Sequence, residues 1–297
     1  MLKRSLVFIT IIMCVLCLSS CGSNKADVKI GGEKIPVGVY NYFYARTPED
    51  SEDRTASAEY LCKKYIAAEH LMGKEGISLS TNLKREAAEE TEKLWSLFSA
   101  YYESIDVSKQ DIAKIKTYEM SKKALLNFYY GAGGRGEVSE DKLREEFAKT
   151  YVGFKAVEAS FIKQDTIGES VEMAESEKKA LRSTFKTMAK KVNGGEDIDS
   201  VNESYNESLG LIVTQPLSLN VIKADDPLYG EDFFSEVAEL SYGKAAVIES
   251  GSSIYMLERV RIDRDDETFV LYAEDVLEDM KMASVEKKIE KIMNENL

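Results

Sequence analysis

The spacing of apolar side chains predicts a helical first half of the chain. Apolar residues recur at every third or fourth position over residues 61–72 and again over residues 83–105, which places them on one face of a helix in each case. Ser108, followed three residues later by Asp111, has the pattern of a capping box and predicts the start of a third helix. Before these helices, a loose alternation over residues 28–37, around Gly31-Gly32, predicts a short pair of strands or a turn.

The pattern changes after a run of glycines at residues 131–136, which predicts a domain boundary. Alternation of apolar and polar residues predicts a strand at residues 157–161 and two further short strands at residues 245–249 and 253–260. Between them, residues 181–192 have helical spacing and end at a pair of glycines, a strong stop signal. The second half of the chain is therefore predicted to be a mixed unit of helices and strands.

A long amphipathic helix is predicted over residues 267–296. Its inward face is expected to carry Phe269, Ala273, Val276, Met280 and Ala283. Taken together, the patterns predict an α+β chain in three parts: a mostly helical domain at residues 28–134, a small mixed α/β domain at residues 135–265, and a C-terminal helix at residues 266–297.

The first 20 residues have the features of a secretory signal. Two basic residues precede an apolar run at residues 6–18, which is too short to cross a hydrocarbon core that needs roughly 20 residues of helix. The segment closes with Leu18-Ser19-Ser20-Cys21, which resembles the bacterial lipobox. This resemblance implies that the signal is removed before Cys21, that Cys21 carries the lipid, and that residues 21–27 are a tether on the outer face of the cell membrane. The alternative is an ordinary secretory signal with a cysteine beside it by chance.

Composition excludes several classes of function. The formal net charge is −13, and it becomes −15 once Lys3 and Arg4 leave with the signal, so nucleic acid is a poor partner because phosphate binding draws on clustered basic residues. Beyond Cys21 the chain has one cysteine, Cys62, and one histidine, His70, too few for a zinc site of the usual kind. The glycine run matches G-x-G-x-x-G, but it follows a predicted helix instead of a strand, which favours a flexible linker over a dinucleotide site. We predict neither a cofactor nor a metal.

The order of patterns along the chain resembles the PrsA and SurA foldases. Residues 138–147 resemble the helix that leads into the isomerase domain of these proteins, and residues 194–201 are similar to the parvulin G-x-D-F-x-x-L-A stretch. Residues 157–162 and 254–260 resemble the first and last strands of that domain, and residues 30–36 resemble the opening of a SurA-type N-terminal domain. The resemblance covers nearly all of the chain beyond Cys21, and its weight lies in the order of the motifs.

The resemblance implies a domain layout and a function. A SurA-type helical domain and the C-terminal helix, which folds back onto it, would enclose an inserted parvulin-like domain. The implied function is that of a membrane-anchored chaperone or foldase, and the implied partners are unfolded or nascent secreted polypeptides.

The departures from the family pattern bear on mechanism. Parvulins use two histidines, one on the first strand and one on the last, whereas the corresponding positions here are expected to hold Phe161 (or Ser160) and Tyr255. Tyr229 and Phe233 lie near the Met and Phe positions of the family's proline pocket. These departures imply that peptidyl-prolyl isomerase activity is weak or absent.

If isomerase chemistry is lost, a polypeptide-binding role remains. Tyr42 and Tyr102 are expected to be partly exposed and to bind clients, whereas Phe98 and Tyr101 lie on the inward stripe of their helix and are expected to be core. The alternative to a chaperone is a structural or ligand-binding surface lipoprotein. A fully active isomerase would require two histidines, which His70 alone cannot supply.

Overall fold

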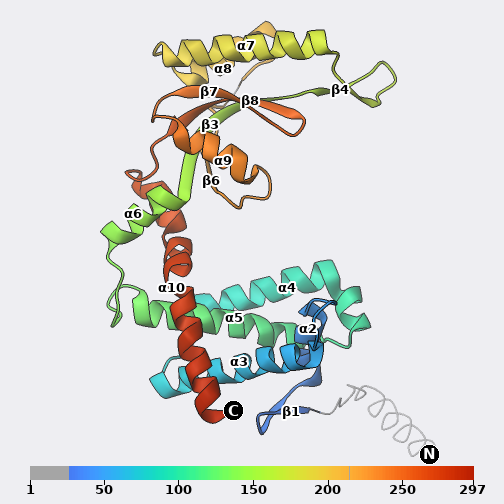
Figure 1. The fold of residues 1–297 in the computed structure, drawn as a ribbon, viewed down its shortest axis with the longest axis vertical. Coiled ribbons are helices and arrows are strands. Elements are labelled where there is room, and N and C mark those ends of the chain that lie inside the picture. Colours follow the sequence, from blue (N-terminus) through green and yellow to red (C-terminus); the bar gives the residue numbers. More distant parts are fainter. Residues whose placement is uncertain (1–26, 214) are drawn as a thin grey trace, which may run out of the picture. The chain divides into compact units, whose positions relative to one another are not determined.

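The computed structural model describes residues 27–213 and 215–297, which divide into two compact units (Figure 1). The first unit contains the described residues up to Glu137 together with Glu278–Leu297, and the second is Val138–Leu277. Helices occur together with antiparallel sheets, so the predicted α+β class is confirmed. The predicted signal segment and Cys21 lie outside the described residues. No helix within the described ranges combines the length and the apolar character that crossing a bilayer requires.

The first unit consists of a strand pair and a set of helices. Its elements are β1 (Val28–Ile30), β2 (Glu33–Ile35), α2 (Val37–Arg46), α3 (Arg54–Glu75), α4 (Thr81–Ser104), α5 (Lys109–Tyr130) and the last part of α10 (Asp266–Asn296). Strands β1 and β2 pair antiparallel, as the alternation before the helices predicts.

The start of α5 shows how the sequence encodes a helix boundary. Ser108 Oγ accepts the backbone N–H of Asp111 at 3.2 Å, and the Asp111 carboxylate accepts the backbone N–H of Ser108 at 3.0 Å, so the predicted capping box is confirmed. The same carboxylate lies against Gly38 at the start of α2, where any Cβ atom would collide with it. Glycine at position 38 therefore lets α2 approach the capped end of α5 closely.

The second unit is a four-stranded antiparallel sheet with helices on both faces. Its elements are α6 (Glu140–Thr150), β3 (Tyr151–Ser160), β4 (Ile162–Gln164), β5 (Ser170–Glu172), α7 (Glu175–Asn193), α8 (Ile198–Ser208), β6 (Asn220–Lys223), α9 (Gly230–Glu239), β7 (Ala245–Ser250), β8 (Ser253–Val260) and the first part of α10. The strand order in the sheet is β6-β3-β8-β7, and β4 and β5 form a separate hairpin.

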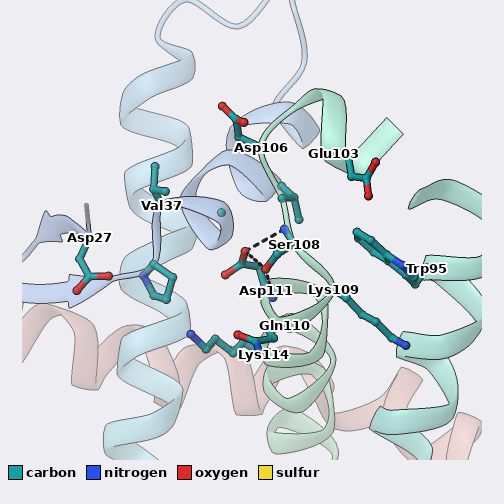
Figure 2. Close-up of a pocket in the computed structure, with 13 residues that line it drawn as sticks. Asp27, Val37, Trp95, Glu103, Asp106, Ser108, Lys109, Gln110, Asp111 and Lys114 are labelled. Carbon is teal, nitrogen blue, oxygen red and sulfur yellow. Dashed lines mark hydrogen bonds between the residues drawn. The ribbon is translucent and has the colours of Figure 1, made fainter. Parts of the chain in front are cut away.

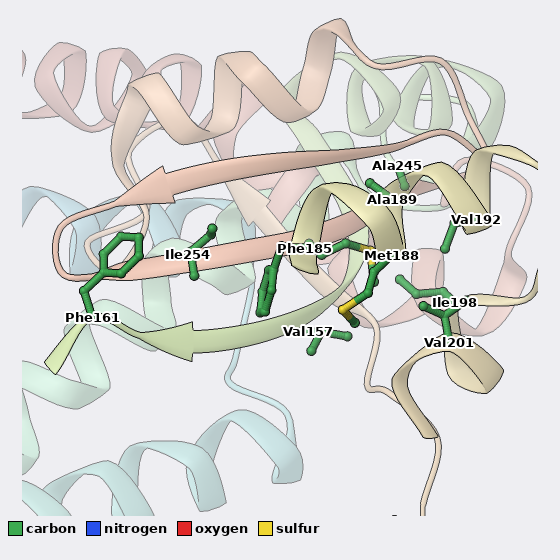
Figure 3. Close-up of a cluster of buried hydrophobic side chains, with 11 residues drawn as sticks. Val157, Phe161, Phe185, Met188, Ala189, Val192, Ile198, Val201, Ala245 and Ile254 are labelled. Atoms are coloured by element: carbon green, nitrogen blue, oxygen red, sulfur yellow. The ribbon is translucent and has the colours of Figure 1, made fainter. Parts of the chain in front are cut away.

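Each face of the sheet has its own apolar cluster. Helices α7 and α8 cover one face, where Phe185 and Met188 of α7 pack on Val157 and Ile254 of the strands (Figure 3). Helix α9 covers the other face, where Phe233 belongs to a cluster with residues of β3, β6, β7 and β8. Because side chains alternate along a strand, consecutive residues of β3 and β8 enter different clusters.

Two predictions about elements need correction. Strand β3 begins at Tyr151, six residues before the predicted strand, because its first part packs on both faces and carries no alternation to detect. The predicted inward stripe of α10 does not hold along its whole length: Ala283 is exposed, whereas Val285 and Ile289 are fully buried. The two parts of α10 belong to different units, so one stripe does not describe both.

Candidate functional site

Four aromatic rings gather on the face of the sheet that α9 covers. Phe154 comes from β3, Tyr255 from β8, Phe233 from α9, and Tyr229 from the position just before α9. The ring centroids of Tyr229 and Phe233 are 4.7 Å apart, those of Phe233 and Tyr255 are 5.2 Å apart, and those of Phe154 and Tyr229 are 5.5 Å apart. We call this cluster the aromatic face. It brings together three of the residues that the sequence proposes for the isomerase-like site, namely Tyr229, Phe233 and Tyr255.

The loop before α9 holds Tyr229 in place. The Asp226 carboxylate accepts the backbone N–H groups of Leu228 at 2.9 Å and of Tyr229 at 3.3 Å. Such an Asp-centred turn is a local feature of the sequence. Phe233 lies one helical turn further on and is almost fully buried, which anchors α9 on the sheet.

Phe161 does not belong to the aromatic face. It follows the last residue of β3 and is buried in the cluster beneath α7, with Phe185 and Ile254 (Figure 3). Tyr255 lies on the opposite face of the sheet, so the expectation that these two residues occupy paired positions in one site is wrong. The alternative position, Ser160, lies opposite Ser253 in the strand register.

Glu158 is the residue of β3 that faces Tyr255. The two are direct partners in the antiparallel register, and the Tyr255 phenol donates a hydrogen bond to Glu158 Oε1 at 3.1 Å. The Ser253 hydroxyl donates to the same oxygen at 2.8 Å. Sequence analysis missed Glu158, although the alternation at residues 157–161 already places it on the face opposite Phe161.

The electrostatics of the aromatic face keep its phenols protonated. Burial raises the pKa of Tyr255, and the charge of Glu158 raises it further. Burial also raises the pKa of Tyr229, and the charges of Glu158 and Asp226 add to that effect. At neutral pH both phenols are hydrogen-bond donors, and the Tyr255 donor is already used by Glu158.

A second group of candidate residues lies in the first unit, and the structure reverses their expected exposure. Tyr42 and Tyr102 are buried, with exposed fractions of 3% and 4%, and their rings stack 6.2 Å apart. Burial raises the pKa of Tyr42 to about 12. These two residues join α2 to α4, and neither is accessible to a client as the sequence suggested.

Phe98 and Tyr101, expected to be core, are instead exposed to 48% and 51%. The reason is a kink in α4: Phe98 has φ −132° and ψ 17°, which are not helical values. The predicted stripe holds as far as Thr91, which is buried, but beyond the kink the helix is rotated and Tyr102 takes the inward position. Leu97, exposed to 64%, lies beside Phe98 and Tyr101, and we call these three residues the α4 apolar patch.

The described residues include neither a cluster of metal ligands nor an accessible thiol. No group of three or more His, Cys, Asp or Glu residues in these ranges is arranged to hold a metal ion. The Cys62 thiol is fully buried in α3, and burial raises its pKa to about 12, so it is not a nucleophile at neutral pH. His70 lies on α3 in the first unit, whereas the aromatic face belongs to the second.

The chain is similar to solved structures of one group of proteins. No family model and no curated protein matches it. A foldase protein PrsA of Streptococcus pneumoniae is 12% identical, with 91% of this chain and 92% of that chain covered and a TM-score of 0.41. PrsA of Lactococcus lactis and PrsA of Bacillus subtilis are each 13% identical, with 92% of this chain and 93% of each of those chains covered, and with TM-scores of 0.43 and 0.35. This is one of the two foldase groups that the sequence motifs resemble. At this level the similarity concerns the arrangement of elements and transfers no activity to the chain.

Proposed function

We propose that this chain is a lipid-anchored folding factor that binds unfolded secreted polypeptides outside the cytoplasm and has weak or absent prolyl isomerase activity. The observation that carries the proposal is the α4 apolar patch, in which Leu97, Phe98 and Tyr101 are about half exposed or more on one side of a long helix. Large apolar side chains exposed side by side are typical of interaction sites.

The size of the patch suits weak, sequence-tolerant binding. Fully burying a large apolar side chain stabilises by about 1.5–3 kcal/mol, so covering the exposed parts of these three would give roughly 2–5 kcal/mol. A free energy of about 4 kcal/mol corresponds to a dissociation constant in the millimolar range. Binding of this strength holds an unfolded segment reversibly, and avidity from repeated contacts along a client would strengthen it.

The aromatic face supports the second half of the proposal. Rotation about a peptide bond has a barrier of about 18–20 kcal/mol, and an apolar pocket with suitable hydrogen-bond donors can lower it. Here Glu158 occupies the β3 position opposite Tyr255 and accepts the Tyr255 phenol. Because the Tyr255 phenol already donates to Glu158, it is not free to donate to a substrate carbonyl, and the Tyr229 phenol is the donor of the aromatic face that remains. We therefore expect little catalysis of prolyl isomerisation.

The anchor is part of the proposal as well. The lipobox-like segment puts the lipid on Cys21, six residues before Asp27, the first described residue. Six residues extend over at most about 20 Å, so a lipid at Cys21 would keep the first unit close to the membrane surface. Chains that leave a secretion pore would meet the protein there.

The test is an aggregation and refolding assay with the chain from Gly22 to Leu297, which contains every described residue. A client whose slow refolding phase is prolyl isomerisation is followed by light scattering and by recovery of its native signal. We expect suppressed aggregation and an unchanged slow phase. The double variant Leu97→Gln and Tyr101→Gln should lose most of the suppression, whereas Ile167→Gln, at a residue exposed to 77% in the second unit, should keep it.

Two outcomes would contradict the proposal. Aggregation that proceeds unchanged in the presence of the wild-type chain would favour a structural or ligand-binding lipoprotein. Acceleration of the slow phase at catalytic amounts of protein would show that the aromatic face is an active isomerase despite its Tyr255–Glu158 pair.

A further inference from the structure

A cavity of about 570 Å³ lies at the end of α4 and the start of α5 and α2 (Figure 2). Its walls are Trp95 and Glu103 of α4, the loop at Asp106 and Val107, the first turns of α5, and the residues before and at the start of α2. Tyr102 is buried and its ring contacts Trp95, Phe98 and Tyr101. None of the three residues of the α4 apolar patch lines the cavity.

Trp95 gives the cavity an aromatic wall. Its ring stacks on Tyr102 with the planes only 8° apart and is itself half-buried, and it extends from α4 toward Lys109 and the first turn of α5 (Figure 2). Tryptophan is the aromatic side chain that attracts cations most strongly through its ring face.

The charges around the cavity are predominantly negative. Asp27 and Glu103 are exposed and form no ion pair within the described residues. Of the two lysines that line the cavity, Lys109 is paired with Glu92 at 2.6 Å. Lys114 is the other lysine of the lining, and it has no such partner among the described residues.

The start of α5 does not make the cavity an anion site. A free helix N-terminus favours anions, but here the Asp111 carboxylate already accepts the backbone N–H of Ser108 and supplies the negative charge that the helix end favours. An anionic ligand would meet Asp111 and the carboxylates of Asp27 and Glu103. A cationic ligand would meet the Trp95 ring and the same carboxylates favourably.

We infer that this cavity binds the cationic side chain of a client polypeptide, a lysine or arginine. The inference rests on the proposed client-binding function and names the class of segment that it favours: one that carries a basic residue.

The single tryptophan of the chain makes a direct test feasible, since all tryptophan fluorescence reports on this cavity. The chain from Gly22 to Leu297 is titrated with a short glycine–serine peptide that contains a central Leu-Lys pair, and with the same peptide carrying Leu-Glu. Binding is measured both by the shift in emission and by calorimetry. We expect the Leu-Lys peptide to shift the emission and to bind at least threefold more tightly, with the difference shrinking as salt is added.

Glu103→Gln should weaken binding of the Leu-Lys peptide by about two- to fivefold, because an exposed charge pair contributes about 0.2–1 kcal/mol. It should not weaken binding of the Leu-Glu peptide, because it removes a charge that repels that peptide. Glu89→Gln, at an exposed residue on the same helix that does not line the cavity, is the matched control and should change neither.

Equal affinity for the two peptides, or binding without any change in emission, would overturn the inference. Occupation of the cavity by the chain's own Lys25, two residues before Asp27, would also overturn the inference. It would appear as a change in tryptophan emission between the wild type and Lys25→Ala, both measured without peptide. In either case aggregation of a client could still be suppressed, so failure here is separable from failure of the proposed function.

Discussion

Asp106 has a backbone conformation that is unusual for a residue with a side chain. It is the non-glycine residue with positive φ in the described chain, at 61°, and it follows the C-terminal end of α4. Its N–H donates to the Glu103 carbonyl at 3.1 Å, and the N–H of Val107 donates to the Tyr102 carbonyl at 2.9 Å. This pattern is a Schellman motif, in which glycine is usual at the position of Asp106 because a left-handed conformation is costly for other residues.

Asp106→Gly should therefore stabilise the first unit, by about 1 kcal/mol, because glycine adopts positive φ without strain. The free energy of unfolding of Asp106→Asn should lie between those of the glycine variant and the wild type. The measurement is urea unfolding followed through Trp95, which belongs to the same unit. A less stable glycine variant would mean that the carboxylate contributes more to folding than its backbone strain costs.

At the scale of elements, the helix boundaries could be predicted because their causes are local. Ser108 and Asp111 lie three residues apart, and the glycines after residue 193 follow α7 directly, so the sequence alone indicates where these helices begin and end. The strands β7 and β8 were likewise predicted nearly to their bounds, since a turn at Gly251 separates two runs with clear alternation.

The exposure of individual side chains could not be predicted where it depends on a distant contact or a distortion. No local signal marks the kink at Phe98, yet it exchanges the exposures of Tyr101 and Tyr102. The pairing of Glu158 with Tyr255 depends on the register between strands almost a hundred residues apart in the chain. The site was therefore found in part: its aromatic residues were predicted, and its carboxylate was not.

The last part of α10 is joined to α3 and α5 by an ion network centred on Glu286. Lys64 of α3 and Lys122 of α5 both contact its carboxylate, the latter at 3.2 Å. The Tyr60 phenol donates to Glu290, one turn further along α10, at 2.8 Å. Burial alone would raise the pKa of Glu286, but the hydrogen bonds and charges of the two lysines outweigh burial and lower it.

This lowered pKa gives the network a defined pH dependence. Because the pKa of Glu286 is lower in the folded state than in the unfolded state, its stabilising contribution is present at neutral pH and is lost as the pH falls through the folded value. Glu286→Gln should lower the free energy of unfolding by about 1–3 kcal/mol at pH 7, and its difference from the wild type should shrink below about pH 4. Urea unfolding at several pH values measures this difference. Glu295→Gln, on the same helix but in a loose surface pair with Lys291, should have little effect at any pH.

At the scale of the whole molecule, the negative charge is concentrated in the second unit. Residues 138–277 contain 29 acidic and 16 basic residues, a net charge of −13, whereas the described part of the first unit has 23 acidic and 20 basic residues, a net charge of −3. On α9 the four exposed acids Glu231, Asp232, Glu236 and Glu239 form no ion pair within the described residues. A field of this kind acts at long range, whereas the Trp95 cavity acts on contact.

The long-range field of the second unit and the contact charges of the Trp95 cavity predict different effects of salt and of mutation. An unfolded client with a positive net charge should associate faster than one with a negative net charge at low salt, and the difference should largely vanish at physiological ionic strength, where screening acts over about 8 Å. Replacing the four α9 acids by their amides should reduce this salt dependence of the association rate, measured by stopped-flow fluorescence of labelled clients. Glu103→Gln should leave the association rate nearly unchanged, because it removes one charge of many. It should instead raise the dissociation rate, because that charge is expected to contact the client directly. Equal association rates for both clients at low salt would mean that the charge of the second unit does not steer clients, and contacts in the first unit alone would then account for any preference.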